Sequence, residues 1–365
     1  MKSGTLHHAD IKLLRSSHRL NPKFMYLRHV YFSAKRRIEF YRMLNTLTDN
    51  GVSIQSALTL IKSKFDQIKQ AKNPMNAIIS DILFAMHTGV PFYHAMAKWV
   101  PNQEYVLIES SHQDIPLALK IVIQHAEHAL SIRSALTSSL TYPILMFILL
   151  VLTLTALSFY IMPNMAKLTP VSNWPPISYN LYLLSNFITQ HYLFLTLFMI
   201  TALIFIVWSL PNLAFFPVRL LLDRFPPWSI YKSYTATSFL IALSSAIKLG
   251  SSFNSSIQKL HPISSAYLKR YLSKVKNRLI SGSGFGDAID IGIFDNITLV
   301  SLSVFAVTNK LEQGIQYIAD HNLEEQKQII VRRGKLLGYG MMAFVAVMIG
   351  WVVLSMYGMQ SAVSV

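Results

Sequence analysis

The 365-residue sequence predicts an all-α membrane protein in which two duplicated cytoplasmic bundles, of about six helices each, accompany three transmembrane helices. Three observations predict this fold class. Three long segments lack Asp, Glu, Lys and Arg, the charged segments between them repeat each other, and their hydrophobic residues recur at helical spacing. Only 14% of all residues are charged, against roughly 25% in an ordinary soluble protein.

The uncharged segments are long enough to cross a bilayer as helices. They cover residues 134–166, 168–218 and 336–365. Within the first, Tyr142–Ile161 contains 20 residues, which form a helix of about 30 Å and match the thickness of the hydrocarbon layer. The third segment is richer in Met, Gly and Ala than the other two. The alternative is that these helices are buried in a large soluble core.

Basic residues predict the orientation of the chain. Residues 1–133 contain 17 Lys and Arg against 9 Asp and Glu, and residues 219–335 contain 15 against 8. Lys167 is the one charged residue between the first two spans. The positive-inside rule therefore places both basic segments in the bacterial cytoplasm, with the N-terminus inside and the C-terminus in the periplasm. The net charge of +16 is explained by this topology and by attraction to anionic lipid, so a nucleic-acid partner is not expected.

These features give a domain order. The predicted segments are a basic cytoplasmic N-terminal segment (1–34), bundle 1 (35–135), transmembrane helix 1 (136–162), a periplasmic loop (163–190), transmembrane helix 2 (191–211), bundle 2 (212–335), transmembrane helix 3 (336–358) and a periplasmic tail (359–365). The first 40 residues have no apolar run of signal-peptide length, so no cleaved signal is expected. The absence of cysteine excludes disulfides and thiolate metal sites.

The two cytoplasmic segments are copies of each other. Phe40–Gly51 matches Phe239–Gly250 at an offset of 199 residues, and Gly89–Ala95 matches Gly282–Ala288 at an offset of 193. Because loop lengths change easily, small differences in offset are compatible with one duplicated fold. Glycine accepts the left-handed backbone conformation that ends a helix. Four glycines are therefore predicted as structural turns: Gly51, Gly89, Gly250 and Gly282.

Two helical repeats that each run into a membrane helix, followed by a final span, resemble the platform proteins of type II secretion (protein F) and type IV pili. The residues that carry the resemblance are Phe40–Gly51, Gly89–Ala95 and Leu117 through Tyr142 and Pro143, and it covers about residues 35–360. The resemblance makes Tyr142 and Pro143 the aromatic–proline pair at the entry to the first span.

The chain departs from the family pattern at one place. Where the family usually has a Gly-Glu-x-x-Gly stretch, this chain has Ser110–Asp114, and Thr308–Lys310 in the second copy. Whether this chain retains an acidic cation site of its relatives is therefore left open by the sequence. The divergence is closer to the type IVb and plasmid-borne pilus branch.

The resemblance implies an inner-membrane platform that is not itself an enzyme. It would couple a cytoplasmic assembly ATPase to insertion or extraction of pilin subunits, alongside other inner-membrane components and further copies of itself. A transporter component and a membrane enzyme acting on lipid-linked substrates are the alternatives. A transporter normally needs charged or strongly polar groups at membrane depth, and the three spans contain no Asp, Glu, Lys or Arg. The enzyme would need a clustered acid or His at the membrane face, and the segment 163–191 contains no acid. The sequence leaves pilus assembly, protein secretion and DNA uptake open.

Two kinds of residue are candidates for contacts. Basic residues that could meet anionic lipid or the ATPase are Lys35, Arg36 and Arg37 before bundle 1, and Arg332 and Arg333 before the third span. Ala346 and Gly350 form a small-xxx-small pair that allows close approach of a helix, either within the chain or from a second membrane protein such as a pilin.

No catalytic, cofactor-binding or metal-ligating residue is predicted. The chain lacks the GxxxxGK[ST] phosphate loop, and Gly282–Gly286 does not have GxGxxG spacing. His125 and His128 share one helix face while Glu127 points elsewhere, which favours an inter-helix or solvated histidine pair over a metal site.

Overall fold

The computed structural model contains only helices, turns and loops over the residues that it describes, which confirms the all-α fold class. The described residues are 30–67, 73–111, 114–168, 170–214, 216–308, 310–321 and 323–363. The chain divides into two compact units. The first combines the chain up to Arg133 with Thr235–Glu324, and the second combines Ser134–Tyr234 with the chain from Glu325 onward.

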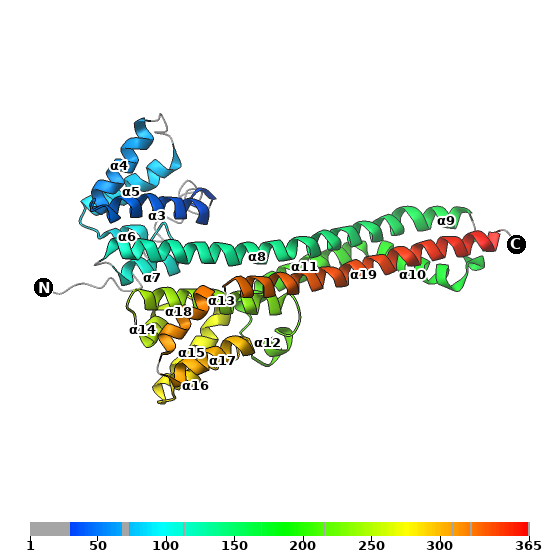
Figure 1. Cartoon of the computed structure of the whole chain (residues 1–365). Helices are drawn as coiled ribbons and strands as arrows, with labels where there is room; N and C mark the ends of the chain where they lie inside the picture. Colours follow the sequence, from blue (N-terminus) through cyan, green and yellow to red (C-terminus); the bar gives the residue numbers. More distant parts are fainter. Residues whose placement is uncertain are drawn as a thin grey trace. The chain divides into compact units, whose positions relative to one another are not determined.

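Bundle 1 is built from six helices of the first unit (Figure 1). They are α3 (Ala34–Asp49), α4 (Ile54–Gln67), α5 (Pro74–His87), α6 (Phe92–Met96), α7 (Asn102–Ser110) and the first part of α8 (Ile115–Ala156). Phe40 and Leu44 lie one turn apart on α3 and share a fully buried core with Leu58 of α4 and Ile79 of α5. The stripe of apolar residues spaced three and four apart thus forms the inward face of each helix.

Bundle 2 repeats this order of helices. They are α13 (Trp228–Lys248), α14 (Phe253–Leu260), α15 (Ala266–Ile280), α16 (Phe285–Ile289), α17 (Asn296–Val307) and α18 (Leu311–His321). Phe239 and Leu243, each 199 residues after Phe40 and Leu44, are buried like their counterparts. The predicted duplication into two bundles of about six helices each is confirmed over the residues that the structure describes.

The four glycines assigned to turns all have positive φ. The angles are +80° at Gly51 and Gly250, +87° at Gly89 and +79° at Gly282. In each case the next residue donates its N–H to the carbonyl five residues before it, at 3.0–3.1 Å. This is the bond of a Schellman cap, and it requires the left-handed residue that glycine supplies.

Side chains of the two bundles meet within the first unit. Nδ1 of His125 on α8 lies 3.4 Å from Oγ of Ser245 on α13, and Ala246 belongs to the core of bundle 1. Burial lowers the pKa of His125 to about 4, although the charge of Glu104 acts in the opposite direction. His125 is therefore a neutral residue between helices at pH 7.

Within the described part of the chain, three helices are long and apolar enough to cross a membrane. They are the helical run Ile115–Lys167, α11 (Tyr192–Asn212) and Leu323–Gly358 within α19 (Leu323–Val363). Their apolar side chains are largely exposed in the structure, among them Leu152 on α8, Phe205 on α11 and Val347 on α19. Hydrocarbon is the medium in which such surfaces are stable, and a helix satisfies its own backbone hydrogen bonds there.

The connection between the first two spans, which the sequence analysis treats as a loop, is largely helical. The π-helical segment η2 (Leu157–Ile161) leads into α9 (Met162–Leu168), η3 (Val171–Asn173) and α10 (Pro176–Gln190). The carbonyl of Ser158 accepts hydrogen bonds from Ser185 at 3.5 Å and Thr189 at 3.3 Å, both on α10. A π-helical turn leaves backbone carbonyls available for such bonds.

The helix α10 also contacts the end of α19. Oγ of Ser178 donates to the carbonyl of Ser355 at 2.8 Å, and Nε1 of Trp351 donates to the carbonyl of Ile177 at 3.1 Å. Hydrogen bonds to backbone carbonyls therefore join the helical connection to both the first and the third span within the second unit.

Close approach of α8 and α19 depends on glycine. A Cβ atom at Gly334 would lie 2.5 Å from the carbonyl oxygen of Ser139, and one at Gly338 would overlap the ring of Tyr142. The hydroxyl of Tyr142 lies 3.1 Å from Sδ of Met342, and Pro143 is buried inside α8. Of the aromatic–proline pair, Tyr142 thus faces α19.

The pair Ala346 and Gly350 lies further along α19. Ala346 is exposed, and a Cβ atom added at Gly350 would have no heavy atom within 4 Å. Packing inside the chain therefore uses Gly334 and Gly338. The role of Ala346 and Gly350 in helix packing stays a prediction.

We expect Gly334→Ala to destabilise the protein by about 1–3 kcal/mol, because the added methyl group meets backbone rather than a movable side chain. Thermal unfolding in mild detergent would measure this. Gly340→Ala is the matched control, since a Cβ there has open space and alanine favours a helix by about 1 kcal/mol over glycine. Equal midpoints for the two variants would contradict the close approach of α8 and α19.

Candidate functional site

A buried ion pair lies just after the second span. Arg219 on α12 (Phe216–Leu222) faces Asp223 one turn later, with 2.9 Å between Nε and Oδ1. Each side chain is only 3% exposed. The Nη1 group of Arg219 also donates to the carbonyl of Ser209 at 3.2 Å, near the end of α11.

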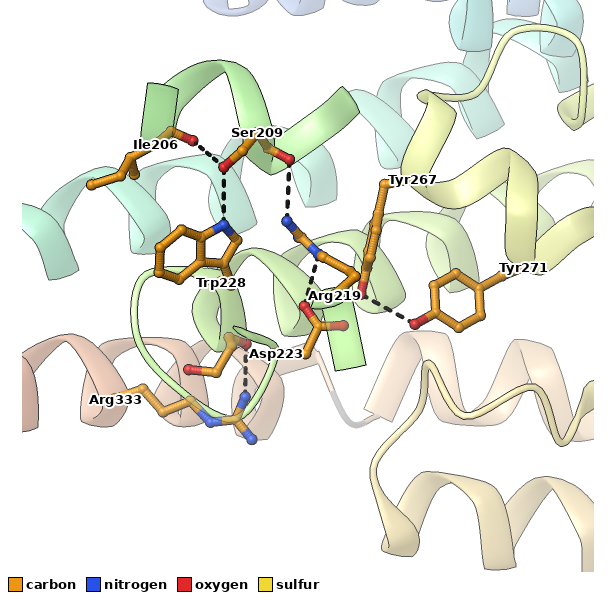
Figure 2. A network of polar contacts seen from close by, with 9 residues as sticks. Ile206, Ser209, Arg219, Asp223, Trp228, Tyr267, Tyr271 and Arg333 are labelled. Atoms are coloured by element: carbon orange, nitrogen blue, oxygen red, sulfur yellow. Dashed lines mark hydrogen bonds and ion pairs between the residues drawn. The ribbon is translucent and has the colours of Figure 1, made fainter. Parts of the chain in front are cut away.

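Trp228 joins α13 to the same point. Its Nε1 donates to Oγ of Ser209 at 3.0 Å, and that hydroxyl donates in turn to the carbonyl of Ile206 at 2.9 Å (Figure 2). Ser209 therefore accepts bonds from α12 through its carbonyl and from α13 through its hydroxyl. The end of the second span is fixed to both helices that follow it.

Arg333 brings α19 into the network. Its Nη1 donates to the carbonyl of Ser229 at 2.8 Å and to Oγ of Ser233 at 2.6 Å, both on α13. Nearby, burial lowers the pKa of Lys232 and the charge of Arg333 lowers it further, whereas Asp223 opposes the change. The polar network thus connects the ends of α11 and α12 with the start of α13 and with the part of α19 that precedes the predicted third span.

The surface around α12 is reversed relative to that of a water-soluble protein. Its charged pair is buried, while Val218, Leu221 and Phe225 are exposed. Apolar groups outside and paired charges inside are the arrangement expected in contact with lipid. The exposed apolar surface of the second span therefore continues past Asn212 onto α12.

The network holds the helices that it joins in one arrangement. A buried, hydrogen-bonded ion pair holds its partners in one geometry, since separating the charges leaves one of them uncompensated. Over the described residues, no group of three or more His, Asp or Glu residues is placed to hold a metal ion.

The basic residues before bundle 1 occupy different environments. Lys35 and Arg36 are exposed, and the guanidinium of Arg36 lies 3.9 Å from the centroid of the Tyr31 ring. Arg37 instead makes a two-bond contact with Glu104 of α7, at 2.9 and 2.8 Å. The upstream residues Arg15, Arg19 and Arg28 lie outside the described part of the chain.

The Arg37 contact belongs to the interior of bundle 1. The hydroxyl of Tyr41 donates to Glu104 at 2.7 Å. Burial raises the pKa of Tyr41 well above its usual value, and the charge of Glu104 raises it further. Burial alone would lower the pKa of Arg37, but its hydrogen bond and ion pair with Glu104 raise it overall. We therefore assign Arg37 to folding, because its side chain is only 12% exposed.

The two basic residues before the third span, Arg332 and Arg333, also lie in different environments. Arg332 is exposed, whereas Arg333 is held by α13.

The sequence did not indicate the functional role of Ser209, Arg219, Asp223 and Trp228. One signal was present, since Arg219 and Asp223 are four residues apart among large apolar residues, and such a spacing places opposite charges on one face of a helix.

Comparison with known proteins identifies a family. The family model described as type II secretion system (T2SS), protein F, matches the chain twice, at residues 40–163 and 239–359.

Two relatives agree with this match. The chain is 23% identical to the toxin coregulated pilus biosynthesis protein E of Vibrio cholerae, over 83% of this chain and 89% of that protein. It is 21% identical to the protein transport protein HofC homolog of Haemophilus influenzae, over 87% of this chain and 82% of that protein.

We expect Asp223→Asn to destabilise the protein by about 3–5 kcal/mol, because it leaves the Arg219 guanidinium buried without its counter-charge. The measurement is the unfolding midpoint in detergent. Replacing both partners, as Arg219→Met with Asp223→Leu, should recover most of the loss. Glu127→Gln, which breaks the exposed pair with Arg42, is the control and should cost about 1 kcal/mol or less. An equal loss in the control and in Asp223→Asn would contradict the importance of burial.

Proposed function

The chain belongs to the type II secretion system protein F family, which forms inner-membrane platforms of type II secretion and type IV pilus machines, and we propose that it couples a cytoplasmic ATPase to insertion or extraction of pilin subunits. Chemistry would take place in the ATPase. This chain would supply docking bundles on one side of the membrane and helices beside which pilins move.

One observation carries the proposal. The family matches begin at Phe40 and Phe239, inside the first helix of each bundle, and end at Pro163 and Met359. Each match therefore contains most of a bundle and the apolar helix that follows it. Two units of bundle plus span are what a device needs if it is to pass a conformational change from a soluble partner to the membrane.

The topology belongs to the same proposal. We place both bundles in the cytoplasm, because the two charged segments that contain them have 17 and 15 basic residues. The helical connection containing α10 and the C-terminus would then lie in the periplasm. The apolar exterior of α12 supports a membrane location for the end of the second span, since its exposed side chains would face lipid. The positive charge near the membrane would attract anionic lipid.

Rigid rotation of the bundles is the proposed means of coupling. The helix α13 begins in the network around Ser209 and Asp223 and ends in bundle 2. A rotation of α13 would act on the ends of α11 and α19 through Trp228 and Arg333. Partners would be the ATPase, pilins, other inner-membrane components and further copies of this chain.

Exposed basic residues suit the ATPase contact. Lys35 and Arg36 open the first helix of bundle 1 and are both exposed. A contact of this type gains from charge complementarity with an acidic surface and weakens as salt increases. Arg37 is left out of the proposed contact because Glu104 already neutralises it.

Deleting the gene should abolish filaments while pilin synthesis and processing continue, because the platform would act after those steps. Electron microscopy of shed filaments and immunoblotting of mature pilin would measure both. Complementation with the intact gene is the control. Normal filaments in the deletion strain would end the proposal of pilin handling.

Reversing two charges should weaken recruitment of the ATPase. The variant Lys35→Glu with Arg36→Glu is expected to reduce co-purification of the ATPase several-fold, with a larger effect at low salt. The matched control is Lys120→Glu with Lys276→Glu, which makes the same change of charge at exposed positions elsewhere. Unchanged recruitment in the first variant would remove Lys35 and Arg36 from the contact.

A further inference from the structure

Bundle 2 carries an apolar stripe on its surface. Ile297, Val300, Val304 and Val307 of α17 are 65%, 62%, 60% and 86% exposed. They follow one another at intervals of three, four and three residues, so they lie on one face of the helix. A row of exposed apolar side chains on a helix of a folded bundle indicates a surface that another molecule covers.

The equivalent helix of bundle 1, α7, already makes a contact with bundle 2 inside the chain. Helix α7 contacts α14 of bundle 2, and Nζ of Lys259 on α14 donates to Oγ of Ser110 on α7 at 3.0 Å. Val106, one turn before Ser110, is only 7% exposed and belongs to the core of bundle 1. The chain thus contains one contact between an α7-type helix and an α14-type helix.

The duplication identifies the counterpart of this contact. Aligning Asn102 with Asn296, the first residues of α7 and α17, pairs Val106 with Val300 and Ser110 with Val304. Because α17 has 12 residues against 9 in α7, its last three residues have no counterpart, and the turns that follow the two helices still correspond. The offset of 199 residues that relates α4 to α14 pairs Leu60 with Lys259. Leu60 is 42% exposed.

We propose that α17 of one copy docks on α4 of a second copy, and so repeats between chains the contact that α7 and α14 make within one chain. Leu60 of one copy would meet Val304 of the next, in the position that Lys259 and Ser110 occupy inside the chain. The inference deepens the proposed function, since it names how the copies of the platform meet.

The change from polar to apolar residues supports a contact between chains. Inside one chain, the covalent link already holds α14 near α7, and a hydrogen bond between Lys259 and Ser110 suffices. Between chains, association costs translational and rotational freedom, which buried apolar surface must offset. The chain has its apolar pair, Leu60 and Val304, at the two positions that the internal contact leaves exposed.

The geometry makes the interface heterologous. Each copy would present α17 to one neighbour and α4 to another, so the arrangement closes into a ring or extends as a row. It does not pair α17 with α17. The bilayer is the competing cover for an apolar helix, and the experiment separates the two.

The absence of cysteine allows a direct test. Two differently tagged full-length chains, one with Leu60→Cys and one with Val304→Cys, are co-expressed and treated in membranes with a short bismaleimide. A cross-linked product that carries both tags is expected. Both positions are exposed, so neither substitution should disturb folding.

Matched controls define the outcome. Leu60→Cys with Ile280→Cys uses an equally apolar residue, 74% exposed, at the end of α15, and should give no product. Each single variant expressed alone should also give none. Products from Val304→Cys alone, or protection of Val304→Cys from maleimide by lipid without any mixed product, would overturn the interface.

The two proposals fail in different ways. Loss of the mixed product, together with loss of filaments on gene deletion, would remove this interface and leave the platform role intact. A mixed product in a strain whose filaments do not need the gene would keep the interface and remove the role in pilin handling.

Discussion

A charged side chain is strongly destabilised in hydrocarbon, and this constraint organises the chain. It accounts for the three uncharged segments. The residues within them are helical because a helix pairs its backbone groups within the segment, where hydrocarbon offers no other partner. It also accounts for α12, where Arg219 and Asp223 face inward and Leu221 faces out. Charge near the bilayer is tolerated there because it is paired and buried. The same pair positions the end of α11 against α13.

Duplication supplies the second organising feature. One bundle design, with the same caps at Gly51 and Gly250 and the same core positions at Phe40 and Phe239, appears twice in one chain. Two copies of a fold need not keep identical surfaces. In bundle 1, α7 contacts α14, whereas in bundle 2 one face of α17 is exposed. The duplication therefore creates one contact within the chain and leaves the equivalent helix faces available to other molecules.

Glycines near one another on a helix, and neighbouring basic residues, can lie in different environments. The amino-acid type alone does not tell which residue is buried and which is exposed. Gly334 and Gly338 let α8 and α19 approach, while Gly350 lies in open space. Arg36 is exposed, while Arg37 next to it is paired with Glu104. Neighbours on a helix point in directions about 100° apart, so adjacent residues of one type can serve folding and binding separately.

The sequence by itself determined the all-α class, the three apolar helices, the duplication and the glycine turns, because each leaves a local or periodic pattern of charge, hydrophobicity or left-handed backbone. It did not reveal the helices of the connection at Pro176–Gln190, the partner of Arg37, or the polar network around Ser209. Those depend on which residues meet across long separations, such as Arg333 with Ser229. Only tertiary packing decides such pairs, since burial and hydrogen-bond geometry are properties of the folded chain.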